Sequence, residues 1–183
     1  LVRHPPTLAR LRAEITSTIG TQPNPTRDQI RNMPFLAGIL SESLRLYPRV
    51  PVNNREAVRT TILPTGGGAD GKSPIMVRVR QLTAEKHFGE DADEFRPERW
   101  ETGELADVGW GYFPFLRGPR QCIGEDFARM EVAYAVVRLV QEFVGIEMPE
   151  GEVVEAVGRE RQRLTLVLSC EDGCRVRARR AAA

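Results

Sequence analysis

One ten-residue segment, Phe115–Gly124, constrains this chain more than any other, because it places a cysteine among glycines and an arginine directly before a long apolar run. It reads Phe-Leu-Arg-Gly-Pro-Arg-Gln-Cys-Ile-Gly. A cysteine just before a helix lies near unpaired backbone N–H groups and the positive end of the helix dipole, which favour the thiolate, the form that binds metals. The segment therefore predicts a loop that presents Cys122 as a metal ligand.

The neighbours of Cys122 fit the same interpretation. Gly118 and Gly124 indicate positions where the backbone approaches a flat cofactor, or adopts a conformation that a Cβ atom would forbid. Arg120 supplies a permanent cation suited to a carboxylate, and Phe115 supplies a ring that can pack under the loop. The alternative is a buried structural thiol, which is what most isolated cysteines are.

Composition limits the class of protein. The 183 residues are 41% hydrophobic and 28% charged, which is normal for one globular domain and excludes an obviously disordered chain. A net charge of +1 gives no argument for nucleic acid as a partner, so we interpret the basic tail around Arg175–Arg180 as a solvated strand face. No apolar run approaches the roughly 20 residues that a membrane span needs, and the first residues show no secretory signal.

Hydrophobic periodicity and capping residues predict most of the helices. Prolines followed by Leu8, Leu11 and Ile15 predict a first helix that ends near Gly20. A capping box and a proline-bounded segment predict two more. The last helix is apolar on most sides, so we expect it to be buried. The four helices are expected over residues 5–20, 26–32, 35–47 and 125–144.

Between the helices the sequence predicts strands and irregular structure. Short β-prone runs around a glycine-rich turn predict a small sheet with strands near 57–63 and 75–80, followed by a short helix near 83–88. Residues 89–121 predict a long irregular segment of the kind that usually has a function. The end predicts a hairpin that pairs 163–169 with 174–179 through a turn at Glu171–Gly173. The expected fold class is mainly α, with a small β-sheet and a C-terminal β-hairpin.

The two other cysteines flank this predicted turn. Cys170 and Cys174 would face each other across it, which permits a zinc or disulfide interpretation. Two cysteines without a second pair are weak support for either, and the two histidines lie in unrelated contexts. We interpret them as unremarkable hairpin thiols, and the odd cysteine count fits a reducing compartment.

A second pattern places Glu42 and Arg45 on one helix, three residues apart, where they can form an ion pair. The same spacing occurs at Glu56 with Arg59 and at Glu160 with Arg163, so the bare pattern carries little information. The alternative is a solvated pair on the surface.

Taken together, these segments resemble the cytochrome P450 family. Phe115–Gly124 matches its haem signature, Phe-x-x-Gly-x-Arg-x-Cys-x-Gly. Ser41–Pro48 matches the helix that carries its Glu-x-x-Arg motif, and Pro97–Trp100 matches its Pro-Glu-Arg-aromatic run. The motifs, the small sheet, the long helix and the terminal hairpin follow in the family's order. The resemblance implies a partial cytochrome P450 fold, with residues 1–183 as the C-terminal, haem-ligating part of one domain.

The resemblance implies a cofactor and a set of residues that hold it. Cys122 would be the axial iron ligand of a thiolate-ligated haem b, with Arg120 and Arg55 on the haem propionates. Arg55 is assigned by position alone, and an exposed strand arginine is the alternative. Phe115, Gly118 and Gly124 would shape the loop at the cofactor. No residue of this segment is expected to act on substrate protons.

The resemblance also implies an architectural role for Glu42, Arg45 and Arg99. They would form a buried ion-pair set that supports the loop carrying Cys122. A carboxylate buried between two guanidiniums is costly to desolvate, and losing one partner is severely destabilising.

Within the family, the chain looks closest to fungal alkane and fatty-acid hydroxylases. Such an enzyme activates O2 at haem iron and inserts one oxygen atom into a C–H bond of a small apolar substrate. The resemblance further implies NADPH–cytochrome P450 reductase as electron donor, with Arg117 and Arg129 as candidate contacts. A full-length relative would lie on the cytosolic side of the endoplasmic reticulum membrane. The segments that carry this likeness are Pro51–Arg55, Pro64–Lys72, Glu90–Trp100 and Gly109–Phe115.

Two departures from the family pattern suggest an alternative. The family's N-terminal half, with its membrane anchor and its distal acid–alcohol helix, has no counterpart here, so we expect a C-terminal fragment. The stretch from Val77 to Gly89 is shorter by about nine residues, the length of one strand and its turn. The alternative is a truncated, non-catalytic haem-binding remnant with exposed apolar surface.

Overall fold

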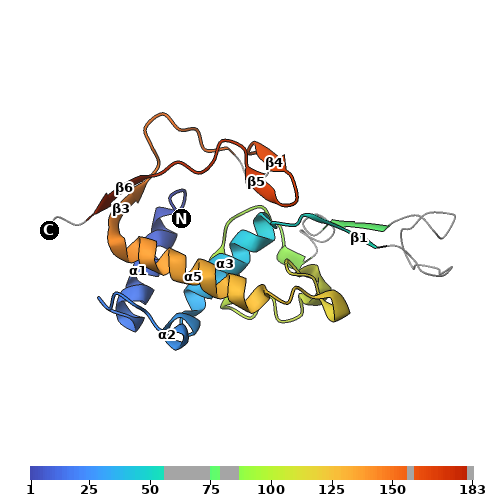
Figure 1. Ribbon diagram of the computed structural model, residues 1–183, viewed down its shortest axis with the longest axis horizontal. Coiled ribbons are helices and arrows are strands. Elements are labelled where there is room, and N and C mark those ends of the chain that lie inside the picture. The colour runs from blue at the N-terminus through green and yellow to red at the C-terminus, as the bar shows by residue number, and fades with distance from the viewer. Residues whose placement is uncertain (56–74, 79–86, 156–158, 181–183) are drawn as a thin grey trace.

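The computed structural model describes residues 1–55, 75–78, 87–155 and 159–180 (Figure 1). The described part of the chain contains α-helices, an irregular segment with three short 3-10 helices, and three two-stranded sheets. The fold class is therefore as predicted. The helices are α1 (Pro5–Thr18), α2 (Arg27–Arg31), α3 (Pro34–Leu46), α5 (Glu125–Glu142), η1 (Pro97–Trp100), η2 (Gly109–Gly111) and η3 (Gly118–Arg120).

Local sequence signals explain where these helices begin and end. Prolines occupy the first turns of α1 and α3. Helix α2 begins with the predicted capping box, in which the backbone N–H of Gln29 donates to the Thr26 hydroxyl at 3.2 Å and the Gln29 side chain accepts from the Thr26 N–H at 2.8 Å. The four predicted helices are confirmed, with ends that differ by a few residues.

The hydrophobic core lies where α1, α3 and α5 meet, and α5 crosses the other two (Figure 1). Each helix contributes one apolar stripe at helical spacing, as the periodicity of α1 predicted. The buried residues of these stripes are Leu8, Leu11, Ile15, Phe35, Leu36, Ile39, Ala133, Val137 and Val140.

Helix α1 also supplies charged side chains to the ends of its two neighbours. Both amino groups of the Arg12 guanidinium donate at the end of α5, to the carbonyls of Val140 at 2.8 Å and Phe143 at 2.6 Å. The Glu14 carboxylate accepts from the first N–H groups of α3, at 2.8 and 2.9 Å. These contacts satisfy backbone groups that have no partner within their own helix, with charges of the sign each helix dipole favours.

Three antiparallel sheets of two strands each accompany the helices. Strand β1 (Val52–Arg55) pairs with β2 (Ile75–Arg78). Strand β3 (Phe143–Glu147) pairs with β6 (Arg177–Arg180), and β4 (Gln162–Leu164) pairs with β5 (Leu168–Cys170). The strand predicted over 57–63 and most of the helix predicted near 83–88 lie outside the described residues, as does most of the shortened stretch.

The predicted pairing at the C-terminal end is wrong. The chain turns at residues 165–167, inside the predicted first strand, so β4 and β5 form the hairpin, and β6 pairs with β3 instead. The apolar, β-prone run at this turn contains no glycine or proline, so nothing in the sequence marked it. Cys170 and Cys174 therefore do not face each other across paired strands, and both are exposed free thiols. All four residues of β6 are exposed, as the basic tail predicted.

The expectation that the last helix is buried is also wrong. Only Ala133, Val137 and Val140 of α5 are buried, whereas Phe127 is 73% exposed and Leu139 is 53% exposed. Within the described part of the chain, the elements that pack most extensively against α5 are α1, α2, α3 and β3. The exposed residues of α5 leave apolar surface in water, which is what the alternative of a haem-binding remnant predicted.

Candidate functional site

The loop before α5 doubles back on itself. The Cys122 backbone N–H donates to the Phe115 carbonyl at 2.9 Å, which joins the two ends of the loop. Between them, Leu116 and Gly118 have φ angles of 63° and 73°. A positive φ is ordinary for glycine but costly for leucine, so the surrounding contacts must hold Leu116 in place.

Cys122 is exposed and lies just before α5, which begins at Glu125. Its sulfur is 3.9 Å from the point where a Cβ on Gly124 would lie, so a side chain at 124 would contact the thiol. The adjacent Ile123 is fully exposed, at 105%, and Phe127 in the first turn of α5 is 73% exposed. An accessible thiol among accessible apolar side chains fits a flat, largely apolar macrocycle that carries a metal.

The structure describes the side chain of one predicted propionate contact, Arg120, but not that of the other, Arg55. Arg120 lies in η3 and is exposed, and within the described part of the chain it has no hydrogen-bond or ion-pair partner. Its cation is therefore available to a carboxylate. Arg55 ends β1, paired in register with Ile75, and its side chain lies outside the described residues.

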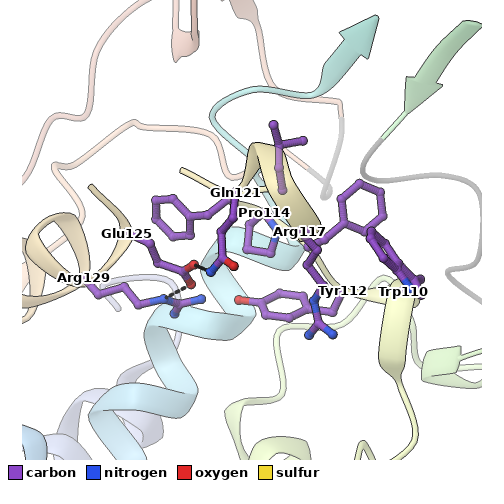
Figure 2. Close-up of a pocket in the computed structure, with 11 residues that line it drawn as sticks. Trp110, Tyr112, Pro114, Arg117, Gln121, Glu125 and Arg129 are labelled. Atoms are coloured by element: carbon purple, nitrogen blue, oxygen red, sulfur yellow. Dashed lines mark hydrogen bonds and ion pairs between the residues drawn. The ribbon is translucent and has the colours of Figure 1, made fainter. Parts of the chain in front are cut away.

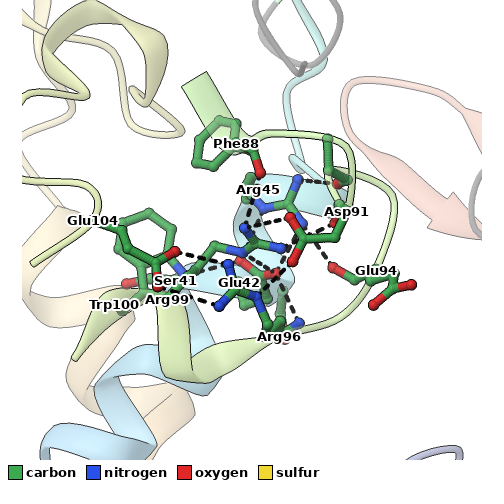
Figure 3. Close-up of polar contacts among 12 residues, drawn as sticks. Ser41, Glu42, Arg45, Phe88, Asp91, Glu94, Arg96, Arg99, Trp100 and Glu104 are labelled. Carbon is green, nitrogen blue, oxygen red and sulfur yellow. Dashed lines mark hydrogen bonds and ion pairs between the residues drawn. The ribbon is translucent and has the colours of Figure 1, made fainter. Parts of the chain in front are cut away.

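Glu42, Arg45 and Arg99 form one buried cluster (Figure 3). Glu42 is fully buried, and Arg45 and Arg99 are 9% and 1% exposed. Arg45 binds both carboxylate oxygens, with Nε and Nη2 each donating at 2.8 Å, and Arg99 Nε donates at 3.0 Å. A bidentate arginine–carboxylate pair is the strongest geometry for such a bond. The alternative of a solvated surface pair is therefore wrong.

The remaining contacts of the cluster tie α3 to the irregular segment that precedes the cysteine loop. Arg45 donates to the carbonyl of Glu94 at 2.9 Å, and Arg99 donates to the carbonyls of Phe88 and Asp91 at 3.1 and 3.0 Å. The Glu42 carboxylate also accepts from the Trp100 indole at 2.9 Å, and from the Arg96 backbone N–H at 2.9 Å. Sequence reasoning missed this role of Trp100.

Glu42 stays ionised despite its burial. Burial by itself raises the pKa of the Glu42 carboxyl, but hydrogen bonds from Arg45, the Arg96 backbone and Trp100 act in the opposite direction and leave that pKa below its ordinary value. The cluster therefore holds a charged carboxylate between two cations in the protein interior.

On another side of the cysteine loop lies a pocket of about 420 Å³ (Figure 2). Its polar wall is a chain of contacts, in which Glu125 accepts from Gln121 at 2.9 Å and from Arg129 at 2.9 Å. Arg117 is exposed at its edge, whereas Arg129 is half-buried in the pair with Glu125. The other lining residues are Trp110, Tyr112, Phe113, Pro114, Phe115, Leu116 and Gly118.

The described residues contain no cluster of three or more histidine, cysteine or acidic side chains that could hold a bare metal ion. A haem iron can take a single axial ligand from the protein, so the isolated Cys122 fits a haem better than it fits a free ion. None of the described helices is both long and apolar enough to span a membrane.

Comparison with known proteins agrees with the family resemblance that the motifs indicate. The family model of cytochrome P450 matches residues 1–166. This chain belongs to the cytochrome P450 family.

Among its relatives, a cytochrome P450 of Arthroderma benhamiae is 50% identical over 187 residues, which cover 95% of this chain and 38% of that protein. Cytochrome P450 52A6 of Candida tropicalis is 40% identical, and cytochrome P450 52A10 of Candida maltosa is 41% identical, each over 81% of this chain and 31% of its own length. The chain thus spans about a third of the length of these curated relatives.

Proposed function

We propose that this chain is the haem-ligating part of a monooxygenase, with the Cys122 thiolate as the axial ligand of haem b. The observation that carries the proposal is the accessible Cys122 thiol at the start of α5, beside the exposed Ile123, in a loop joined by the Phe115 carbonyl. When bound there, the haem supplies O2 activation and the insertion of one oxygen atom into a C–H bond.

Cys122 lies just before the first residue of α5. The backbone N–H groups and the dipole at the start of a helix stabilise negative charge. Two carboxylates in the first turn would oppose this, but both are paired. Asp126 binds Arg27 and Arg31, and Glu125 binds Arg129 at 2.9 Å. These cations offset the two carboxylates of the first turn.

We assign the propionates of the haem to Arg120 and Arg55. The exposed Arg120 guanidinium, without a partner among the described residues, supports its part, and position on β1 supports that of Arg55. Phe115, Gly118 and Gly124 shape the loop, and the missing Cβ at 124 leaves room beside the sulfur.

We further propose that the substrate is a fatty acid or an alkane, and that NADPH–cytochrome P450 reductase delivers the electrons. The likeness to fungal alkane and fatty-acid hydroxylases supports both, together with a place on the cytosolic side of the endoplasmic reticulum membrane. The exposed Arg117 is a candidate contact with the reductase.

The reduced, CO-bound difference spectrum tests the ligand assignment. The protein, extended to the full length of its gene, is loaded with haem and compared with its Cys122→Ala and Cys170→Ala variants. We expect the absorption band of a thiolate-ligated haem in the wild type and in Cys170→Ala, and its loss in Cys122→Ala. The absence of that band from the wild type, or its survival in Cys122→Ala, would overturn the assignment.

A second candidate function is a truncated, non-catalytic haem-binding remnant. The exposure of Phe127, Val132 and Leu139 favours it, because a haem at Cys122 would meet the 183-residue chain on one side only. The purified chain with haem, reductase and NADPH distinguishes the two. Haem binding without turnover supports the remnant, and steady oxidation of a fatty acid refutes it.

A further inference from the structure

We propose that Trp100, Tyr112 and Arg129 are positioning residues that connect the buried Glu42 cluster to the cysteine loop. The proposal rests on the proposed function only in taking Cys122 as the atom that the loop has to place. The contacts run from α3 through η1 to α5. Of the three residues, Trp100 alone belongs to a motif named above, the Pro-Glu-Arg-aromatic run.

The path begins at a rigid point. Trp100 ends η1 and donates its indole N–H to the Glu42 carboxylate at 2.9 Å. Helix α3 and η1 are packed without slack, because a Cβ on Gly38 would lie 2.9 Å from the Pro97 carbonyl oxygen. The Trp100 ring is therefore held both by its hydrogen bond and by the backbone packing beneath it.

Tyr112 carries the path onward. Its ring lies against the Trp100 ring, with 4.5 Å between centroids and 59° between planes. Its hydroxyl donates to the Ser41 carbonyl at 3.2 Å, next to Glu42 on α3. The same hydroxyl points toward the Arg129 guanidinium, which lines the same pocket (Figure 2). Burial raises the pKa of the Tyr112 phenol, with Arg129 acting in the opposite direction, so Tyr112 stays a neutral donor.

Arg129 contacts Phe115 and Glu125, and Figure 2 shows its ion pair with Glu125. Its guanidinium lies 5.1 Å from the centre of the Phe115 ring, and its Nε donates to Glu125 at 2.9 Å. Phe115 is the residue whose carbonyl accepts the Cys122 N–H, and Glu125 opens the helix that follows Cys122. Arg129 therefore contacts one residue before the cysteine and one after it.

This path is separate from the hydrophobic core. Helix α5 packs into the core through Ala133, Val137 and Val140, whereas Trp100, Tyr112 and Arg129 are only partly buried and lie outside the core cluster. Because the loop holds Leu116 at a positive φ, it should relax locally when the path is cut, while α5 stays folded.

Amide hydrogen exchange tests this without any haem. In the full 183-residue chain, exchange is measured at the Cys122 N–H, which bonds to Phe115, and at the Val137 N–H in the core of α5. Arg129→Met should speed exchange at Cys122 by tenfold or more and leave Val137 unchanged. Tyr112→Phe, which keeps the ring, should give a smaller acceleration at Cys122, and Arg129→Lys should restore part of the protection.

Arg138→Met is the matched control, because Arg138 is also a half-buried arginine of α5 and, among the described residues, its hydrogen bond is to Gln141, at 3.0 Å. It should leave Cys122 unchanged. Unchanged exchange at Cys122 in both Arg129→Met and Tyr112→Phe, or equal acceleration at Cys122 and Val137, would overturn the proposal. If Arg129→Met does not fold, Tyr112→Phe and Arg129→Lys decide by the same criteria.

A double-mutant cycle between the two ends of the path gives a second test. Trp100→Phe removes the indole donor to Glu42 and keeps an aromatic ring against Tyr112. If the path is continuous, the effect of Trp100→Phe on exchange at the Cys122 N–H should be clearly smaller in the Arg129→Met background than in the wild type. Strictly additive effects would show that the two ends act independently and would refute the path. Failure of haem binding would leave these outcomes unaffected.

Discussion

The Glu42 cluster and the cysteine loop lie at the two ends of the proposed path, yet the key polar group of one is buried and that of the other is exposed. Glu42 is fully buried, and its carboxylate accepts five hydrogen bonds from four residues. Cys122 is exposed, and the contacts of its loop are made largely by backbone. A group that is satisfied inside the chain belongs to the architecture, whereas a reactive group that faces outward in a fixed loop is suited to a ligand.

Cutting the cluster should give the largest effect. Glu42→Ala leaves the guanidiniums of Arg45 and Arg99 buried without their carboxylate, so the free energy of unfolding should fall by about 3–5 kcal/mol. Urea unfolding followed by circular dichroism measures it. Glu171→Ala is the control, since it breaks an ion pair with Arg161 that is exposed on both sides. Equal stability of Glu42→Ala and Glu171→Ala would contradict the architectural role.

Acid should weaken the same cluster more gently. The folded-state pKa of Glu42 lies below its ordinary value of 4.5, so its contribution to stability is complete above that pH. It is lost as the pH falls through the lower, folded-state value. Urea unfolding from pH 7 to pH 3 should show a smaller loss in Glu42→Gln than in the wild type. Parallel curves would mean that Glu42 does not titrate in this range.

Removing a helix-end contact should cost less. Arg12→Ala frees the carbonyls of Val140 and Phe143 at the end of α5, and water can reach part of this site. We expect a loss of about 1–2 kcal/mol in the free energy of unfolding. Arg10→Ala on the same helix is the control. Arg10 forms ion pairs with Glu98 and Glu101 that are more exposed than the Arg12 site, so its loss should lower the free energy of unfolding less. A larger loss in Arg10→Ala would contradict the assignment.

Changing the cysteine itself should have the smallest effect on stability. Cys122→Ser alters an exposed side chain, so the free energy of unfolding of the haem-free chain should change by about 0.5 kcal/mol or less. Thermal melts measure this. A large loss would mean that the thiol contributes to packing, and it would weaken the contrast between the two regions.

The sequence predicted what depends on neighbours along the chain. The capping box of Thr26 and Gln29 and the prolines of α1 and α3 act within one helical turn, and these helices are where they were expected. The ion-pair set was predicted from the order of motifs rather than from physics, because its members lie up to 57 residues apart.

What the sequence did not predict depends on distant partners. The exposure of Phe127 and Leu139 follows from which elements reach α5, and an apolar sequence cannot report this. The turn at 165–167 lacks turn residues, and β6 pairs with a strand about 34 positions earlier. Trp100 and Tyr112 are single aromatic residues without a periodic signal, so their contacts with α3 appear only in three dimensions.

Helix α1 carries Arg12 and Glu14 on different sides, one at the end of α5 and the other at the start of α3. One short helix therefore neutralises two opposite helix poles. Deletion of residues 1–18 would free both poles at once, even though neither the Glu42 cluster nor the cysteine loop would lose a residue. An intact α1 in a purified sample therefore indicates that the contacts joining it to α3 and α5 can form.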